Sequence, residues 1–395
     1  MSDTQSKLLF VGIALAFLIW GALGAIIGPL LPEMTEAFSL SSAQAGFVFI
    51  PWSTGFSIGA LTSQRLLHRY KIETLLAAFA GLSILFCIAL FFCNTFIHFL
   101  IIFSLLGSAG GATFTLAHTF VGQTFTKHRV AAISSLDLLF SFGNVSAPLL
   151  LVLLLSFSFG WQSPFLFFAL ACSICLVIYT SILLLTAKQR RSGAEVSSSD
   201  AKPLIAPSKA TLPIGYLIIP AVFMGAFEWG QSIWFVSYSI DSGASETAAR
   251  IGQSVFLAGM ISIRILTIAI GQRSNDTRLV RTLFAFIVLG NLMIVLTGEY
   301  YIHLVGCFIA GAGVGAMFPI ILSRAMEADP ARSASYSVTM ILCITVGGQL
   351  ASLSIGTLAD YYGIANTFRF TTIFGVIFII GFEFFWRRAK ASIAS

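Results

Sequence analysis

The sequence predicts an all-α membrane protein in which twelve transmembrane helices form two six-helix halves. Hydrophobic residues make up 57% of the 395-residue chain and charged residues only 10%, and the mean hydropathy is +0.93. Soluble domains are about half apolar and about a quarter charged. Apolar stretches long enough to cross a bilayer recur along the chain, and one long polar stretch divides them near the middle. These observations exclude a water-soluble fold.

The twelve spans follow from cutting the sequence at its polar clusters, since a spanning helix needs about 20 mostly apolar residues. The first half is expected to contain residues 9–31, 43–64, 73–93, 96–121, 130–155 and 163–186. The second half is expected to contain residues 212–240, 249–272, 279–297, 301–323, 333–357 and 364–386. The Ser-, Lys- and Pro-rich stretch between them offers no apolar face to bury. We therefore expect an N-terminal half at 1–187, a cytoplasmic linker at 188–211 and a C-terminal half at 212–395.

The distribution of Lys and Arg predicts the orientation, because short cytoplasmic loops carry an excess of both. Placing the N-terminus inside puts nearly all of them on the cytoplasmic side, so both termini are expected in the cytoplasm of a bacterium, with the chain in its inner (plasma) membrane. The net charge of +6 is scattered over short loops, which argues against a nucleic-acid partner. The lipid bilayer is the expected partner, and we expect a monomer.

Enzymatic motifs are missing from the sequence, which contains no P-loop, HExxH, GxSxG or kinase signature. The six cysteines stand singly in apolar runs, and the one CxxC, Cys172 to Cys175, lies inside a predicted helix without a His partner. We interpret them as ordinary buried thiols. The sequence therefore predicts no enzyme, no cofactor and no metal.

Two halves of six helices around a central loop are typical of secondary transporters, whose related halves rock about a site near the bilayer midplane. An ionisable side chain at that depth costs about 2.5–3.5 kcal/mol on insertion scales and usually faces a cavity or a partner. Asp137 in the fifth span and Glu228 midway along the seventh are the candidates for proton coupling. The alternative is that each is a permanently hydrogen-bonded structural acid.

Arg264 is the one cation predicted deep in a span, and a buried guanidinium requires an anion. That anion could be Glu228 or a carboxylate or phosphate on a substrate, and a structural role for Arg264 is the alternative. His118, late in the fourth span, could bind a hydroxyl or relay a proton, or it could be a satisfied structural histidine.

Amide and aromatic side chains in the spans suit a site that binds hydroxyl groups and stacks on a sugar ring. Gln231 shares a helix face with Glu228, and Asn144 shares one with Asp137. The other candidates for substrate binding are Trp20, Trp234 and Gln349, although the two tryptophans could merely pack. Glycines cluster in the fourth and tenth spans (Gly107, Gly110, Gly111; Gly306, Gly311, Gly313, Gly315), where small residues let helices approach closely.

Several segments resemble the major facilitator superfamily. The stretch GALTSQRLLHRYKIETLL at residues 59–76 is similar to its loop motif after the second helix, with His68 in the usual Asp position and Lys71 in a usual Gly position. Other segments resemble the fucose permease-like branch of fucose, galactose and glucose:proton symporters. They are FLIWGALGAIIGPLLPEMTEAF, SFGNVSAP, GAFEWGQSIWFVSY and GAGVGAMFPIILS.

This resemblance implies proton-coupled uptake of a small polar solute, often a sugar. Gly28 and Phe114 occupy the positions of the two acids that serve proton and sugar in the fucose carriers, which argues against fucose itself. The seventh-span pattern of the wider branch is present as Glu228, Trp234 and Tyr238, and adds Tyr238 to the binding candidates. Two alternatives stay open: a proton-driven exporter of drug-like or amphipathic compounds, and a membrane receptor or sensor.

Overall fold

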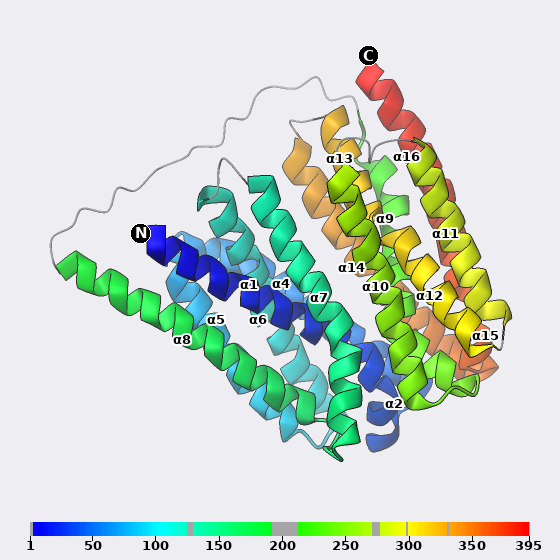
Figure 1. Ribbon diagram of the computed structural model, residues 1–395, viewed down its shortest axis with the longest axis horizontal. Coiled ribbons are helices and arrows are strands. Elements are labelled where there is room, and N and C mark those ends of the chain that lie inside the picture. Colours follow the sequence, from blue (N-terminus) through cyan, green and yellow to red (C-terminus); the bar gives the residue numbers. More distant parts are fainter. Residues whose placement is uncertain are drawn as a thin grey trace. The chain divides into compact units, whose positions relative to one another are not determined.

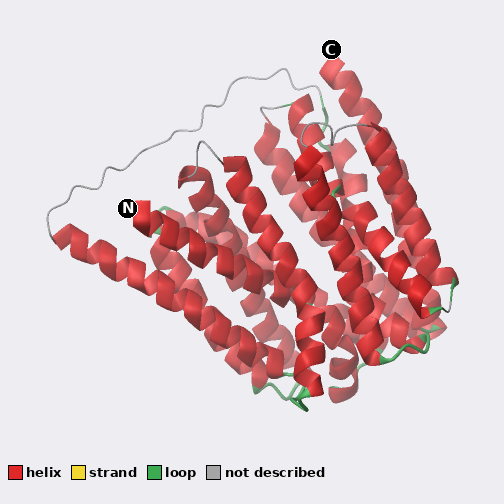
Figure 2. Cartoon of the chain, viewed as in Figure 1, coloured by secondary structure: helices red, strands yellow, loops and turns green. Residues whose placement is uncertain are grey.

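The computed structural model describes residues 3–124, 129–191, 212–270, 277–297, 299–329 and 332–394. Every regular element in these ranges is a helix, as the red ribbons of Figure 2 show, which confirms the predicted fold class. By length and composition, eleven of the described helical segments could cross a membrane. The remaining predicted span corresponds to α9 (Gly215–Asp241), which is 27 residues long and more polar because it contains Glu228 and Gln231.

The chain divides into two compact units, and most of their helices are labelled in Figure 1. Unit 1 comprises Met1–Ile26 and Ile50–Lys202. Its helices are α1 (Asp3–Ala25), α4 (Phe49–Leu67, with Phe49 itself in unit 2), α5 (Ile72–Phe91), α6 (Phe96–Thr124), α7 (Arg129–Ser156) and α8 (Ser163–Arg191). Helix α8 continues into the segment expected as a linker, whose residues 192–211 lie outside the described ranges.

Unit 2 comprises Ile27–Phe49 and Pro203–Ser395. Besides α9 it contains α2 (Ile27–Ala37), α3 (Ser42–Phe47), α10 (Glu246–Ile270), α11 (Thr277–Leu296), α12 (Tyr300–Gly315), α13 (Met317–Ala328), α14 (Ser333–Tyr362), α15 (Ile364–Thr367) and α16 (Phe370–Ala394). The segment Ile27–Phe49 therefore packs with the C-terminal helices, although its sequence neighbours on both sides belong to unit 1. The predicted division at residues 187 and 212 places this segment in the N-terminal half.

Four of the predicted spans are interrupted helices in the described part of the chain, and a proline explains three of the breaks. The fourth break, at Phe368 and Arg369 between α15 and α16, has no proline near it. The interrupting residues Ile26, Val48 and Ala316 each lie three positions before a proline, namely Pro29, Pro51 and Pro319. A proline has no N–H to donate to the carbonyl four residues earlier, so the helical ladder is lost there. Those carbonyls belong to Ala25, Phe47 and Gly315, the residues at which the first helix of each pair ends.

Glycines hold the helices together in the same pattern in both units. A methyl group built on Gly111 of α6 would overlap the Phe56 carbonyl oxygen on α4, and one on Gly311 of α12 would overlap the Phe256 carbonyl oxygen on α10. Gly21 of α1 lies equally close to the backbone of α7. These contacts confirm that the glycine clusters mark close helix crossings.

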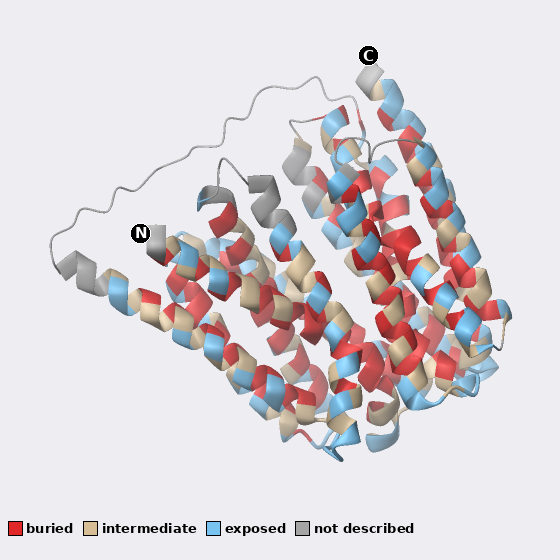
Figure 3. Cartoon of the chain, in the orientation of Figure 1, coloured by how far each residue is buried: buried red, intermediate tan, exposed pale blue. Residues whose placement is uncertain are grey.

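Large apolar side chains cover much of the outer surface. On α8, Leu170 is 67% and Leu184 is 72% exposed, and Figure 3 shows exposed and buried residues alternating along this helix. A water-soluble protein rarely exposes such a continuous apolar face. The side chains are suited to contact with lipid, as expected for an integral membrane protein.

Candidate functional site

Unit 1 brings together two of the predicted site residues, His118 on α6 and Asp137 on α7. The distance from His118 Nε2 to Asp137 Oδ1 is 3.7 Å, and both side chains are accessible, with 27% and 53% of their surfaces exposed. The two residues lie on different helices, so their sequence spacing gave no indication of this contact. The structure thus creates a histidine–carboxylate pair inside the membrane-spanning part of unit 1.

The hydrogen bonding of His118 defines how this pair can change charge. Its Nδ1 lies 2.9 Å from the Phe114 carbonyl oxygen, which can only accept, so Nδ1 carries a hydrogen and donates it. In the neutral ring, Nε2 is then an acceptor facing a carboxylate. A proton added at Nε2 converts this arrangement into an ion pair with Asp137. The pair can therefore hold one proton between an acid and a base.

Aromatic rings pack against the histidine of this pair. Phe17 of α1 stacks on Phe114, with ring centroids 5.0 Å apart, and also contacts His118 at 5.2 Å and Phe140 at 6.4 Å. The predicted ligand Trp20 is 5% exposed and lies against Gly110 and Trp52. The predicted ligand Asn144 is partly exposed on α7, two turns beyond Asp137. Phe17, Phe114 and Phe140 were not among the predicted binding residues.

Unit 2 contains the predicted acid Glu228 on α9, partly exposed, and the predicted cation Arg264 on α10. The charge of Arg264 acts on the Glu228 carboxylate across the space between α9 and α10. Arg264 also has a backbone partner, because its Nε donates to the Gly315 carbonyl oxygen at 2.8 Å. That oxygen is the one that Pro319 leaves without a helical donor, so Arg264 completes the hydrogen bonding of the break between α12 and α13.

Gln231 has its amide inside unit 2. It is 1% exposed, and its Nε2 donates to Asn291 Oδ1 at 2.5 Å and approaches Thr371 Oγ1 at 3.4 Å. Asn291 in turn donates to Thr372 Oγ1 at 2.6 Å. This network ties α9, α11 and α16 together.

Trp234 and Tyr238 also use their polar atoms on neighbouring helices. The Trp234 indole nitrogen donates to the Ser352 carbonyl oxygen at 3.3 Å, and the Tyr238 hydroxyl donates to the Ile294 carbonyl oxygen at 2.9 Å. Both residues are buried. Trp234 and Tyr238, which were predicted as binding residues, therefore pack between helices in this structure. Their role in binding the solute stays a prediction.

Gln349 is partly exposed on α14. Near it, Trp229 follows Glu228 in the sequence and packs against Phe49 with ring centroids 4.6 Å apart, and the Trp229 ring also touches Gly348. Sequence reasoning missed Trp229, although its position next to the acid was a usable signal. It also missed the buried Arg250, whose spacing of four residues from Glu246 indicates an ion pair on one helix.

These contacts define the chemistry available in each unit. An acid and a basic group lie within the spans of unit 1 (Asp137 and His118) and of unit 2 (Glu228 and Arg264). Such acids can be neutral or charged according to the water and charges around them. Each unit therefore has an ionisable acid within its predicted spans.

Comparison with known proteins places the chain in a family. The sequence pattern described as "Major Facilitator Superfamily" matches residues 9–352. The chain is 24% identical over 391 residues to the glucose/mannose transporter GlcP of Bacillus subtilis (strain 168), covering 95% of this chain and 93% of that protein. It is 22% identical over 380 residues to the probable nitrate transporter NarT of Staphylococcus carnosus (strain TM300), covering 92% and 91%.

Solved structures share the fold at low sequence identity. A bacterial homolog of the human lysosomal transporter Spinster, in an inward-facing and unoccupied conformation, aligns with a TM-score of 0.75 and 14% identity over 99% of this chain and 98% of that one. The nucleoside transporter NupG aligns with a TM-score of 0.71 and 13% identity over 96% and 98%. With the family pattern matching most of its length, the chain belongs to the major facilitator superfamily and is a secondary transporter, not an enzyme.

Proposed function

We propose that this transporter moves a small, neutral, polar solute such as a sugar together with protons, by alternating access. The observation that carries the proposal is the histidine–carboxylate pair of His118 and Asp137 within the spans of unit 1. Unit 2 adds a second acid, Glu228, on which the charge of Arg264 acts. An acid that changes its protonation as its surroundings change can link proton movement to a conformational cycle. The similarity to a glucose/mannose transporter supports a sugar as the solute.

A neutral solute is favoured over an anionic one, because the arginines in the spans already have partners. Arg264 already donates to Gly315 and acts on Glu228, and Arg324 pairs with Glu327 at 2.8 Å and lies over the Trp386 ring. An anion such as nitrate would have to compete with these partners. The aromatic rings around His118 instead offer flat surfaces of the kind on which sugar rings stack.

The two acids are assigned different roles in this proposal. Asp137, with 53% of its side chain exposed, accepts hydrogen bonds from solute hydroxyls with His118 beside it, while Glu228 carries the coupled proton. Trp20, Asn144 and Gln349 complete the proposed binding surfaces. We further propose that the protein acts as a monomer in the bacterial inner membrane with both termini in the cytoplasm.

The test compares driven uptake with exchange in proteoliposomes. Glu228→Gln should abolish uptake driven by a pH gradient, while counterflow of labelled solute, which needs no net proton movement, should survive. Asp137→Asn is the matched control, since it should weaken solute affinity about tenfold to a hundredfold by removing a charge-assisted hydrogen bond. Driven uptake at the wild-type rate in Glu228→Gln would exclude Glu228 as the coupling acid.

The second candidate function is proton-driven export of drug-like or amphipathic compounds. The cluster of Phe17, Phe114 and Phe140 favours it, because stacked rings also bind apolar molecules. Deletion of the gene would then increase sensitivity to such compounds and leave sugar uptake unchanged. The opposite pattern supports the sugar symporter.

A further inference from the structure

The segment Ile27–Phe49, which we call the clasp, is part of unit 2, although it connects helices α1 and α4 of unit 1. Helix α2 lies so close to α9 that a methyl group on Gly28 would overlap the Ser232 carbonyl oxygen. Helix α3 is held by Asp360 of α14, whose carboxylate accepts hydrogen bonds from the backbone N–H groups of Ser42 at 2.7 Å and Ala43 at 3.2 Å.

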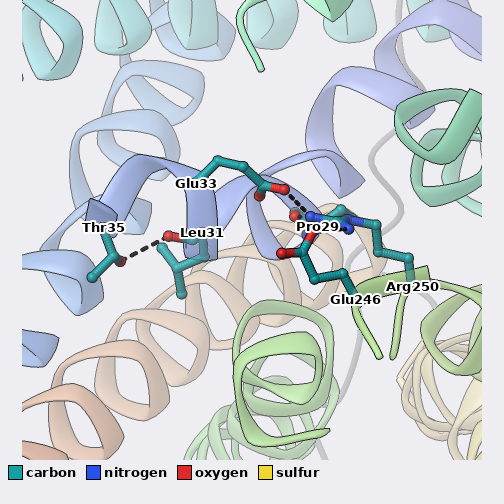
Figure 4. Close-up of polar contacts among 6 residues, drawn as sticks. All are labelled: Pro29, Leu31, Glu33, Thr35, Glu246 and Arg250. Carbon is teal, nitrogen blue, oxygen red and sulfur yellow. Dashed lines mark hydrogen bonds and ion pairs between the residues drawn. The ribbon is translucent and has the colours of Figure 1, made fainter. Parts of the chain in front are cut away.

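One ion cluster attaches α2 to α10 (Figure 4). Arg250 is 1% exposed, and its guanidinium reaches three acceptors. Nη1 donates to Glu246 Oε2 at 3.0 Å, Nη2 donates to Glu33 Oε1, and Nε lies 3.4 Å from the Pro29 carbonyl oxygen. Glu33 and Pro29 belong to α2, whereas Glu246 lies one turn before Arg250 on α10. The guanidinium is thus shared between the clasp and its own helix.

The two carboxylates of this cluster are not equivalent. Glu246 is 62% exposed and Glu33 only 17%, and Glu33 Oε2 is buried with no hydrogen-bond partner among the described residues. Glu33 lies outside the membrane-spanning segments, between the span that ends at Ala25 and the one that begins at Ser42. Its burial raises the pKa of the Glu33 carboxyl above the usual 4.5, although Arg250 acts in the opposite direction; the charge of Glu246 raises the pKa further.

Other ionisable groups near α2 have separate partners. Helix α9 packs against α2 and carries Asp241, which accepts a hydrogen bond from the Ala365 backbone at 3.2 Å. On the same helix, Glu228 is subject to the charge of Arg264, and the Tyr238 hydroxyl donates to the Ile294 carbonyl oxygen. Helix α3 has no ionisable residue, and Glu36 on α2 itself is exposed. Among the described residues, Arg250 and Glu246 are therefore the charged groups that act on the Glu33 carboxyl.

We propose that Glu33 is a proton-binding site and that its protonation releases α2 from Arg250. The neutral carboxyl loses its ion pair, while Glu246 keeps Arg250 neutralised. This second carboxylate is essential to the mechanism, because a buried guanidinium left without an anion would be strongly destabilising. Protonation therefore loosens α2, while the Asp360 contacts keep α3 in place. The use of this release in a transport cycle rests on the proposed proton-coupled function, whereas the release itself does not.

The test measures the distance between α2 and α10 as a function of pH, with no solute present. Nitroxide labels at Ala37→Cys and Thr247→Cys, both exposed positions, are introduced after the six native cysteines are replaced by serine. Double electron–electron resonance in lipid nanodiscs from pH 5 to 9 should show a single narrow distance at high pH. A second, longer distance should gain population as the pH falls.

Two variants distinguish the roles of the acids. Glu33→Gln should show the longer distance at every pH. Glu246→Gln should keep the transition but move its midpoint to lower pH, because the charge that favours Glu33 protonation is gone and release would leave Arg250 unpaired. If Glu33→Gln does not fold, the shift in Glu246→Gln decides the matter.

A distance that is constant from pH 5 to 9, a transition that persists in Glu33→Gln, or an unmoved midpoint in Glu246→Gln would overturn the inference. Its failure is separable from that of the proposed function. Proton-coupled uptake with a constant distance overturns only the role of Glu33. A titrating distance without proton-coupled uptake supports the role of Glu33 and contradicts the proposed function.

Discussion

Replacing Arg264 should destabilise the protein at the proline break between α12 and α13. In Arg264→Met, the Gly315 carbonyl oxygen loses its Nε donor at 2.8 Å, and Pro319 has no N–H to take its place. Hydrogen bonds that involve a charged group contribute about 1.5–3 kcal/mol, and a buried acceptor left unpaired costs about 1–3 kcal/mol. We therefore expect the free energy of unfolding to fall by about 1.5–3 kcal/mol.

Pro319→Ala provides the matched rescue, because alanine restores an N–H directed at the Gly315 carbonyl. A double-mutant cycle of the two substitutions, measured by denaturant unfolding in detergent micelles, isolates this shared hydrogen bond. Pro319→Ala should stabilise the Arg264→Met protein by about 1 kcal/mol more than it stabilises the wild type. Equal effects of Pro319→Ala in both backgrounds would refute the argument that Arg264 substitutes for the missing backbone donor.

Two further substitutions test contacts inside unit 2. Gln231→Leu should lower the free energy of unfolding by about 1–3 kcal/mol, because Asn291 loses its buried amide partner; unchanged thermal stability with lost solute binding would instead make Gln231 a ligand. Asp360→Ala should cost about 0.5–2 kcal/mol, the usual effect of removing a helix cap, since it removes the acceptor at the start of α3. Hydrogen exchange at Ser42 and Ala43 checks this, and protection equal to wild type would contradict it.

Hydropathy was sufficient to predict the long helices because apolar length is the dominant requirement of a bilayer, and eleven described segments meet that requirement. The expected tenth span, 301–323, corresponds to α12 and α13 together, and the expected eighth, 249–272, corresponds to α10. The helix breaks were missed, although Pro29, Pro51 and Pro319 mark three of them in the sequence. A hydropathy average does not register the loss of a single N–H donor.

The site was predictable only in part, because the relevant contacts join residues far apart in the chain. Asp137 and Glu228 could be selected as acids within spans, but the approach of His118 to Asp137 depends on how α6 and α7 pack. Arg250 stands at the start of the expected eighth span, 249–272. Its burial follows from the packing of Glu33 and the clasp on unit 2, which a pattern confined to one helix does not contain.

Proton movement during solute uptake tests the central claim most directly. The purified protein would be placed in proteoliposomes containing a pH-sensitive dye, and neutral sugars would be added outside one at a time, with empty liposomes as the control. At least one sugar should acidify the interior as it enters, and Glu228→Gln should abolish the acidification. Sugar entry without any change of internal pH, or with alkalinisation, would contradict proton symport.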